Sequence, residues 1–203
     1  GGSIVVAEAP FQKADLAGQD HDIDLHWRLN SSPVVAALFT HADLLANAQP
    51  IEALHPSARR LSDVDSLLFA AVHRRLHVDK PTHIHLNGVA HPVIDTLSWL
   101  MDIDLLFSSL TDKDRKRLVE QARLKGIADI LAETLRRAQL RLGTKVPQAT
   151  IDELEAEGQG VIARYISAPP VRALLLNLEE LSGVSTKARY LHELFLPSGE
   201  YMR

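Results

Sequence analysis

The chain has 203 residues, enough for one substantial hydrophobic core or for one domain with an appendage. Its formal net charge of −4 excludes a general nucleic-acid-binding surface, which needs an excess of Lys and Arg. Cysteine is absent, which excludes a disulfide framework and Cys-ligated zinc, so any metal must use His, Asp or Glu. No apolar run approaches the roughly 18 residues that suggest a membrane span, so we expect a cytoplasmic protein without a membrane partner.

Two short segments near the N-terminus have the composition of strands. Residues 3–9 are β-branched and precede Pro10, which predicts a first strand that ends there. Residues 20–29, DHDIDLHWRL, alternate with period two and predict a half-buried strand. The face that we expect to lie on the core consists of His21, Ile23, Leu25, Trp27 and Leu29.

The rest of the chain has the periodicity of helices. Ser32 and Pro33 predict a helix start and a helix over residues 34–47. Further helices are predicted from Ser62 to about His77 and over residues 93–110, 114–125, 127–142, 150–166 and 171–181. The predicted fold class is α+β and predominantly α, with a small antiparallel or mixed strand pair in residues 1–30 and a multi-helix bundle in residues 31–203.

Asp22, Asp24 and His26 form a row of candidate metal ligands on the polar face of the second strand. Carboxylates at positions i and i+2 of a strand lie roughly 6 to 7 Å apart, close enough to share one or two divalent cations. The same pattern also suits an exposed strand face on which Arg28 and water satisfy the acids. The residues alone leave both interpretations open.

A second candidate metal site involves histidines. His73 and His77 stand four residues apart and share one face of a predicted helix, as helical metal ligands do. No Glu follows His73, so the pair lacks the general base of a zinc protease, although His83, His85 and His91 are near enough in sequence to complete a site. A histidine near a helix C-terminus is also favoured by the helix dipole alone.

Two further groups of charged residues are ambiguous. Asp102 and Asp104 lie in a predicted helix, where they point about 200° apart and cannot share a cation, so we expect at least one to pair with a buried Arg or His. Some arginines are available for phosphate groups, although solvated arginines are commoner: Arg28, Arg59, Arg60, Arg74 and Arg75.

Several segments taken in order carry a resemblance to a known family. They are residues 22–29, the helix over residues 61–77 with its spaced histidines, residues 97–102 (LSWLMD), and the closing LFLP and YMR segments at residues 194–197 and 201–203. From about residue 11 to its end, the chain resembles the bacterial uncharacterised nucleotidyltransferases of the polymerase-beta-like superfamily.

The resemblance implies a site and a reaction. Proteins of that superfamily hold two magnesium ions with three carboxylates of a small sheet and transfer a nucleotidyl group from a nucleoside triphosphate to an acceptor. Asp24 matches the third carboxylate. The resemblance thus makes Asp22 and Asp24 catalytic candidates, adds His26 as a metal ligand, and offers Arg28 to the nucleotide.

The chain departs from the family pattern at its start. The family's first strand and its Asp-x-Asp strand should precede Ser3, so we expect a C-terminal portion that is inactive alone, with transfer to an unknown acceptor performed by a full-length parent. Alternatively, Gly2-Ser3 and Asp22-x-Asp24 are themselves the first motif, although Pro10 and Gly18 interrupt the helix that should lie between them.

A different class of function also fits the sequence. The chain would then be a non-catalytic helical binding or assembly domain in which residues 20–29 are only a structural edge strand. Because an exposed edge strand can pair with a second chain, a homodimer through residues 3–9 or 20–29 is a reasonable hypothesis.

Overall fold

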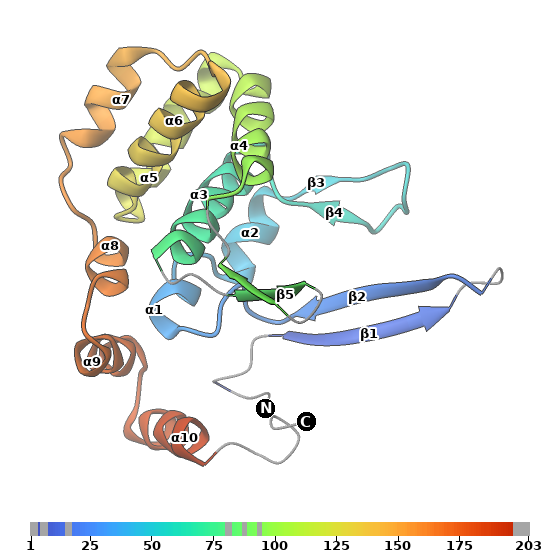
Figure 1. The fold of residues 1–203 in the computed structure, drawn as a ribbon, viewed down its shortest axis with the longest axis vertical. Coiled ribbons are helices and arrows are strands. Elements are labelled where there is room, and N and C mark those ends of the chain that lie inside the picture. The colour runs from blue at the N-terminus through green and yellow to red at the C-terminus, as the bar shows by residue number, and fades with distance from the viewer. Residues whose placement is uncertain are drawn as a thin grey trace. The chain divides into compact units, whose positions relative to one another are not determined.

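The computed structural model describes residues 4, 8–14, 18–79, 83–86, 89–92 and 95–196, without the side chains of residues 8–10, 22, 24, 79, 83–86 and 89–92. It is predominantly helical and has a small antiparallel strand pair near the N-terminus, which confirms the predicted fold class (Figure 1). None of the helices in the described ranges has both the length and the apolar character needed to cross a bilayer. The chain forms two compact units, one from Gly1–His41 with Pro169–Arg203 and the other from Ala42–Ala168.

The first unit contains an antiparallel hairpin of β1 (Glu8–Ala14) and β2 (Asp20–His26). Phe11 lies opposite Ile23 in the register. Much of the predicted first strand lies outside the described residues, and the prediction that it ends at Pro10 is wrong because β1 continues past this residue. Both strands of a two-stranded sheet are edges, where the missing N–H of proline is tolerated.

The apolar face of β2 is not buried, contrary to the sequence-based expectation. Ile23 and Leu25 expose 58% and 56% of their surface, and Phe11, opposite Ile23, exposes 54%. Trp27 is also exposed. Alternation along a strand separates an apolar from a polar face, but it does not supply a layer to cover the apolar one.

The first unit also contains α1 (Pro33–Ala36), α9 (Pro170–Glu180) and α10 (Val184–Phe195). Ser32 caps α1, and its Oγ donates a hydrogen bond of 2.8 Å to Oδ1 of Asn177 in α9. The same oxygen accepts the backbone N–H of Val34 at 3.3 Å. Asn177, from a distant part of the sequence, therefore accepts one of the backbone N–H groups that have no partner within α1.

The helix predicted over residues 34–47 is interrupted. α1 ends at Ala36, and α2 (His41–Asn47) begins after a turn. The apolar periodicity is shared by both helices, so it does not reveal the break.

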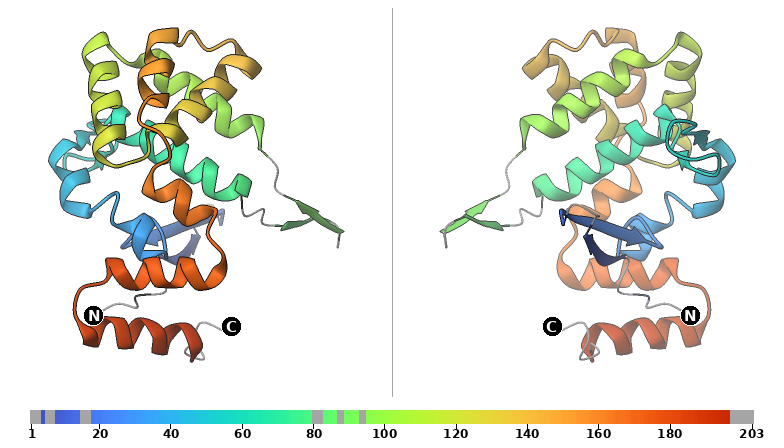
Figure 2. Two further views of the ribbon diagram at one scale, coloured as in Figure 1. Left: turned by 90° about the vertical axis from the view of Figure 1, so that its left-hand side faces the viewer. Right: turned by 90° about the vertical axis from the view of Figure 1, so that its right-hand side faces the viewer.

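The second unit is built around a helical bundle (Figure 2). Leu67, Leu68 and Ala71 of the central helix are 0% exposed, as their i, i+3, i+4 spacing predicts. The bundle comprises α3 (Asp63–Asp79), α4 (Leu97–Ser109), α5 (Asp112–Leu124), α6 (Ala128–Leu142), α7 (Gln148–Glu155) and α8 (Val161–Ile166). Two short hairpins belong to the same unit: β3 (Gln49–Pro50) with β4 (Arg59–Arg60), and β5 (His83–Leu86) with β6 (Val89–Pro92).

Two glycines divide the helix predicted over residues 150–166 into α7 and α8. Gly158 has a φ of +68°, a left-handed conformation that ends a helix readily. Gly160 packs against the turn after α5, where an added Cβ would lie 1.8 Å from the carbonyl oxygen of Gly126. Only glycine fits at this close approach.

Candidate functional site

The β1–β2 hairpin carries the predicted row of metal ligands on one backbone face. Asp22, Asp24 and His26 occupy alternate positions of β2, and the register places Gln12, Pro10 and Glu8 opposite them in that order. Glu8 therefore joins this face from β1. A single strand does not reveal its pairing register, so the place of Glu8 cannot be predicted from the sequence of β2 alone.

The carboxylates on this face fit magnesium, because carboxylate oxygens are the ligands that this ion prefers, whereas the imidazole of His26 is a commoner ligand of transition metals. The fit rests on backbone position, since the side chains of Asp22, Asp24 and Glu8 lie outside the described part of the structure. The predicted metal ligands Asp22, Asp24 and His26 thus share a face by register.

Arg28 follows β2 and is already engaged with its own unit. Its Nη2 donates a hydrogen bond to the backbone carbonyl of Ile4, and the backbone N–H of Ile4 donates to Oε2 of Glu193 at 2.7 Å. Burial lowers the pKa of Arg28, while the charge of Glu193 and the neighbouring Tyr190 oppose this shift. The guanidinium that was predicted to meet the nucleotide therefore also links the strand pair to α10.

His73 and His77 lie together on α3, as predicted, with ring centroids 4.4 Å apart. Burial lowers the pKa of His73, and the proximity of His77 lowers it further. The side chains of His83, His85 and His91, offered as additional ligands, lie outside the described residues. In the part of the chain that the structure does describe, no three His, Asp or Glu side chains are grouped to hold a metal ion.

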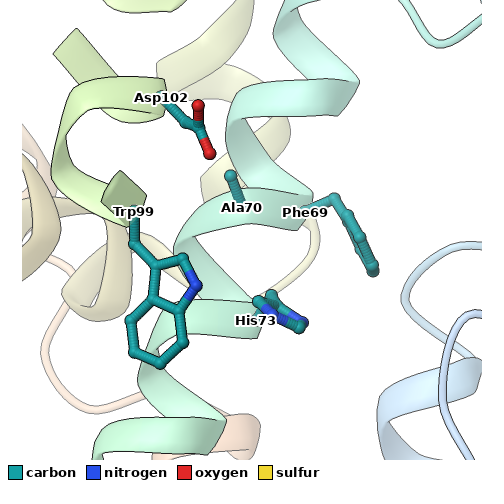
Figure 3. Close-up of a pocket in the computed structure, with 5 residues that line it drawn as sticks. All are labelled: Phe69, Ala70, His73, Trp99 and Asp102. Carbon is teal, nitrogen blue, oxygen red and sulfur yellow. The ribbon is translucent and has the colours of Figure 1, made fainter. Parts of the chain in front are cut away.

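The surroundings of this histidine pair are aromatic. The Trp99 indole of α4 has its centroid 6.0 Å from His73 and 5.4 Å from His77. A pocket of about 310 Å³ opens beside them between the two helices (Figure 3). It is lined by Phe69, Ala70, His73, Trp99 and Asp102.

Arg74 points into the bundle, where its side chain is 1% exposed. Its guanidinium donates to both carboxylate oxygens of Asp95, to Glu133 at 2.6 Å and to the Thr134 hydroxyl at 3.2 Å. These bonds and charges raise the pKa of Arg74 although burial alone would lower it. Arg74 is therefore a structural cation and does not present its charge to a phosphate.

We expected Asp102 or Asp104 to pair with a buried Arg or His, but the carboxylates that pair with the buried Arg74 are those of Asp95 and Glu133. Asp104 accepts a hydrogen bond of 2.7 Å from the Thr144 hydroxyl, while Asp102 lines the pocket. The sequence does contain a signal for Arg74: it stands seven residues after Leu67 and three after Ala71, on the stripe that the helix buries.

Comparison with known proteins identifies the family. Residues 8–143 match the model of a family described as uncharacterised nucleotidyltransferase. The match includes β1, β2 and the helices that form the pocket, and it ends before the closing segments quoted for the resemblance. No curated protein and no solved structure matches the chain. Because the family match spans most of its length, the chain belongs to the uncharacterised nucleotidyltransferase family.

Proposed function

We propose that this protein takes part in transferring a nucleotidyl group from a nucleoside triphosphate to an acceptor, with magnesium and the triphosphate held on the β1–β2 hairpin. The observation that carries the proposal is the family match across a hairpin that has Asp22, Asp24 and His26 on one face. Family membership supports the reaction class, and the register supplies a group of ligands suited to the metal.

The residues of the hairpin have separate roles in this proposal. Asp22 and Asp24 hold magnesium, His26 extends the set, and Arg28 meets the triphosphate. Magnesium held there would neutralise phosphate charge and lower the pKa of the acceptor hydroxyl. The two aspartates are one carboxylate short of the three that the two-metal arrangement of the superfamily uses, and Glu8, a further carboxylate of this face, stands at the end of the row opposite His26 and not beside Asp22. We therefore expect the chain alone to bind the nucleotide without transferring it.

Calorimetric titration with magnesium and a non-hydrolysable ATP analogue tests the proposal. We expect binding that requires magnesium and that weakens by about tenfold or more in Asp24→Asn. Asp20→Asn is the matched control, because Asp20 occupies the same strand face at its far end, opposite Ala14. A chain that does not bind the analogue at millimolar concentration, or an equal loss in the two variants, would contradict the proposal.

A second candidate function is a non-catalytic binding or assembly domain that dimerises through the hairpin. It is favoured by the exposed side chains of Phe11, Ile23, Leu25 and Trp27, since a contiguous apolar patch beside an edge strand is typical of an association surface. Light scattering of the chain and of Ile23→Lys tests it. We expect a dimer that the substitution converts to a monomer; a monomer at high concentration would remove this candidate.

A further inference from the structure

The pocket between α3 and α4 has the composition of a site for a planar ligand. Each helix contributes residues one turn apart, Phe69 and His73 from α3 and Trp99 and Asp102 from α4. In Figure 3 the side chain of Asp102 points from α4 toward Ala70 of α3, and the Trp99 indole extends beside α3 near His73. All of its lining residues belong to the compact unit Ala42–Ala168, and none comes from the β1–β2 hairpin.

Aromatic rings form the walls of the pocket. The His73 ring lies 6.0 Å from both Phe69 and Trp99, centroid to centroid, and stands almost perpendicular to the indole at 89°. All three side chains are partly exposed, so their rings are available to a ligand from solvent. The flat face of a nucleobase stacks favourably on such rings.

Asp102 is the charged side chain among the described residues that line the pocket. Asp102 is exposed, and among the described residues the structure gives its carboxylate neither a hydrogen bond nor an ion pair. Burial, and to a lesser extent the nearby His77, lowers the pKa of His73 and so favours the neutral imidazole. Among the described residues, the pocket therefore combines aromatic walls with one anionic acceptor, which suits a ligand that offers N–H donors at the edge of a flat ring.

The two oxygens of a carboxylate accept best from two adjacent donors. Guanine offers such a pair, its ring N1–H and its exocyclic amino group. Adenine and cytosine place an acceptor nitrogen next to the amino group, which would face the second carboxylate oxygen unfavourably, and hypoxanthine lacks the amino group. A volume of about 310 Å³ is within the range of small-molecule sites and exceeds that of the base alone.

We propose that the α3–α4 pocket binds a guanine nucleoside, with the base against Trp99 and His73 and its two N–H donors on the carboxylate of Asp102. The choice of a nucleobase among planar rings rests on the proposed function. The site itself goes beyond that function, because it lies outside the hairpin that would hold magnesium and the triphosphate.

The test uses nucleosides, which carry no phosphate and need no metal. The chain contains two tryptophans, Trp27 and Trp99, so the indole N–H signals of the ¹⁵N-labelled protein can be assigned with Trp27→Phe. We expect guanosine to shift the Trp99 signal saturably and to bind about tenfold or more tightly than inosine or adenosine, equivalent to about 1.4 kcal/mol. Asp102→Asn should weaken guanosine binding by a similar factor.

Asp112→Asn is the matched control, since it removes one carboxylate that is 95% exposed at the start of α5, outside the pocket. Thermal unfolding of each variant confirms that the fold is retained. Equal binding of guanosine and adenosine, an unchanged guanosine affinity in Asp102→Asn, or an unmoved Trp99 signal at millimolar guanosine would each overturn the assignment. Asp24→Asn should leave guanosine binding intact, so failure of the pocket and failure of the hairpin proposal are distinguishable.

Discussion

The guanidinium of Arg74 meets the carboxylate of Asp95 through two parallel hydrogen bonds, from Nε at 2.8 Å and from Nη2 at 2.6 Å. The fork of Arg matches a carboxylate in this geometry, and Lys does not reproduce it. Glu133 of α6 accepts from the same guanidinium. One buried cation therefore ties α3 to Asp95, two residues before α4, and to α6.

Replacing Arg74 should destabilise the second unit strongly. Arg74→Met leaves Asp95 and Glu133 without their shared cation, and we expect a loss of about 3 kcal/mol in the free energy of unfolding in urea at pH 7. The control is Arg137→Ala, which removes a 47% exposed side chain from the same Glu133 and should cost about 0.5 kcal/mol or less. Similar losses in both variants would mean that the buried cation has no special role.

Stability should fall in acid partly through Glu133. Burial raises the pKa of this carboxyl, but hydrogen bonds from Arg74 and Arg137 and the nearby charge of Arg75 outweigh burial and lower it. Because the pKa of Glu133 is lower in the folded protein, it stabilises the fold at a pH above the pKa of the unfolded state, which is about 4.3. This contribution is lost as the pH falls through the pKa of the folded state. In urea titrations from pH 7 to pH 3, Glu133→Gln should show a smaller loss than the unmodified protein. An identical slope would refute this assignment.

The imidazole of His73 should titrate below its ordinary value of about 6.5. Burial is the larger cause and the proximity of His77 the smaller, so Trp99→Ala should raise the pKa of His73 more than His77→Gln does. Because the pKa of His73 is lower in the folded than in the unfolded protein, it favours the folded state at a pH above the unfolded pKa. This contribution is lost as the pH falls through the pKa of the folded state. NMR titration of the ring signals measures the pKa of His73 in each variant. A larger rise in His77→Gln than in Trp99→Ala would contradict the prediction.

Gly160 should tolerate no side chain. Because its Cβ would lie 1.8 Å from the carbonyl oxygen of Gly126, Gly160→Ala must separate α8 from the turn after α5, and we expect a loss of about 3 kcal/mol. Gly158→Ala tests the alternative of backbone strain. Gly158 has a φ of +68° and no atom within 4 Å of an added Cβ, so about 1 kcal/mol should be lost. Urea unfolding of both variants compares them, and equal losses would exclude crowding as the cause.

The helices of the second unit are predictable because their apolar residues recur every three or four positions and become buried together. Leu67, Leu68 and Ala71 follow this rule and are fully buried. The rule fails where one stripe continues through a break, as at Gly158. It also fails for Ile23 and Leu25, because alternation identifies an apolar face whether or not another layer covers it.

The candidate sites were predictable only where neighbours in sequence are neighbours in space. The row of Asp22, Asp24 and His26 follows from alternation along one strand. The place of Glu8 depends on the register between two strands, and the pocket depends on which helix packs beside α3. His73 was therefore noticed as a candidate metal ligand, but its juxtaposition with Trp99 follows only from tertiary structure.

The cap that Asn177 places on α1 has a consequence for synthesis of the chain. The oxygen that accepts the N–H of Val34 belongs to a residue 143 positions later. The unit Ala42–Ala168 is one continuous segment, whereas the cap of α1 needs Asn177 of α9, which the ribosome adds only after the whole of that unit. The hairpin with the proposed nucleotide ligands therefore belongs to the unit that is completed last.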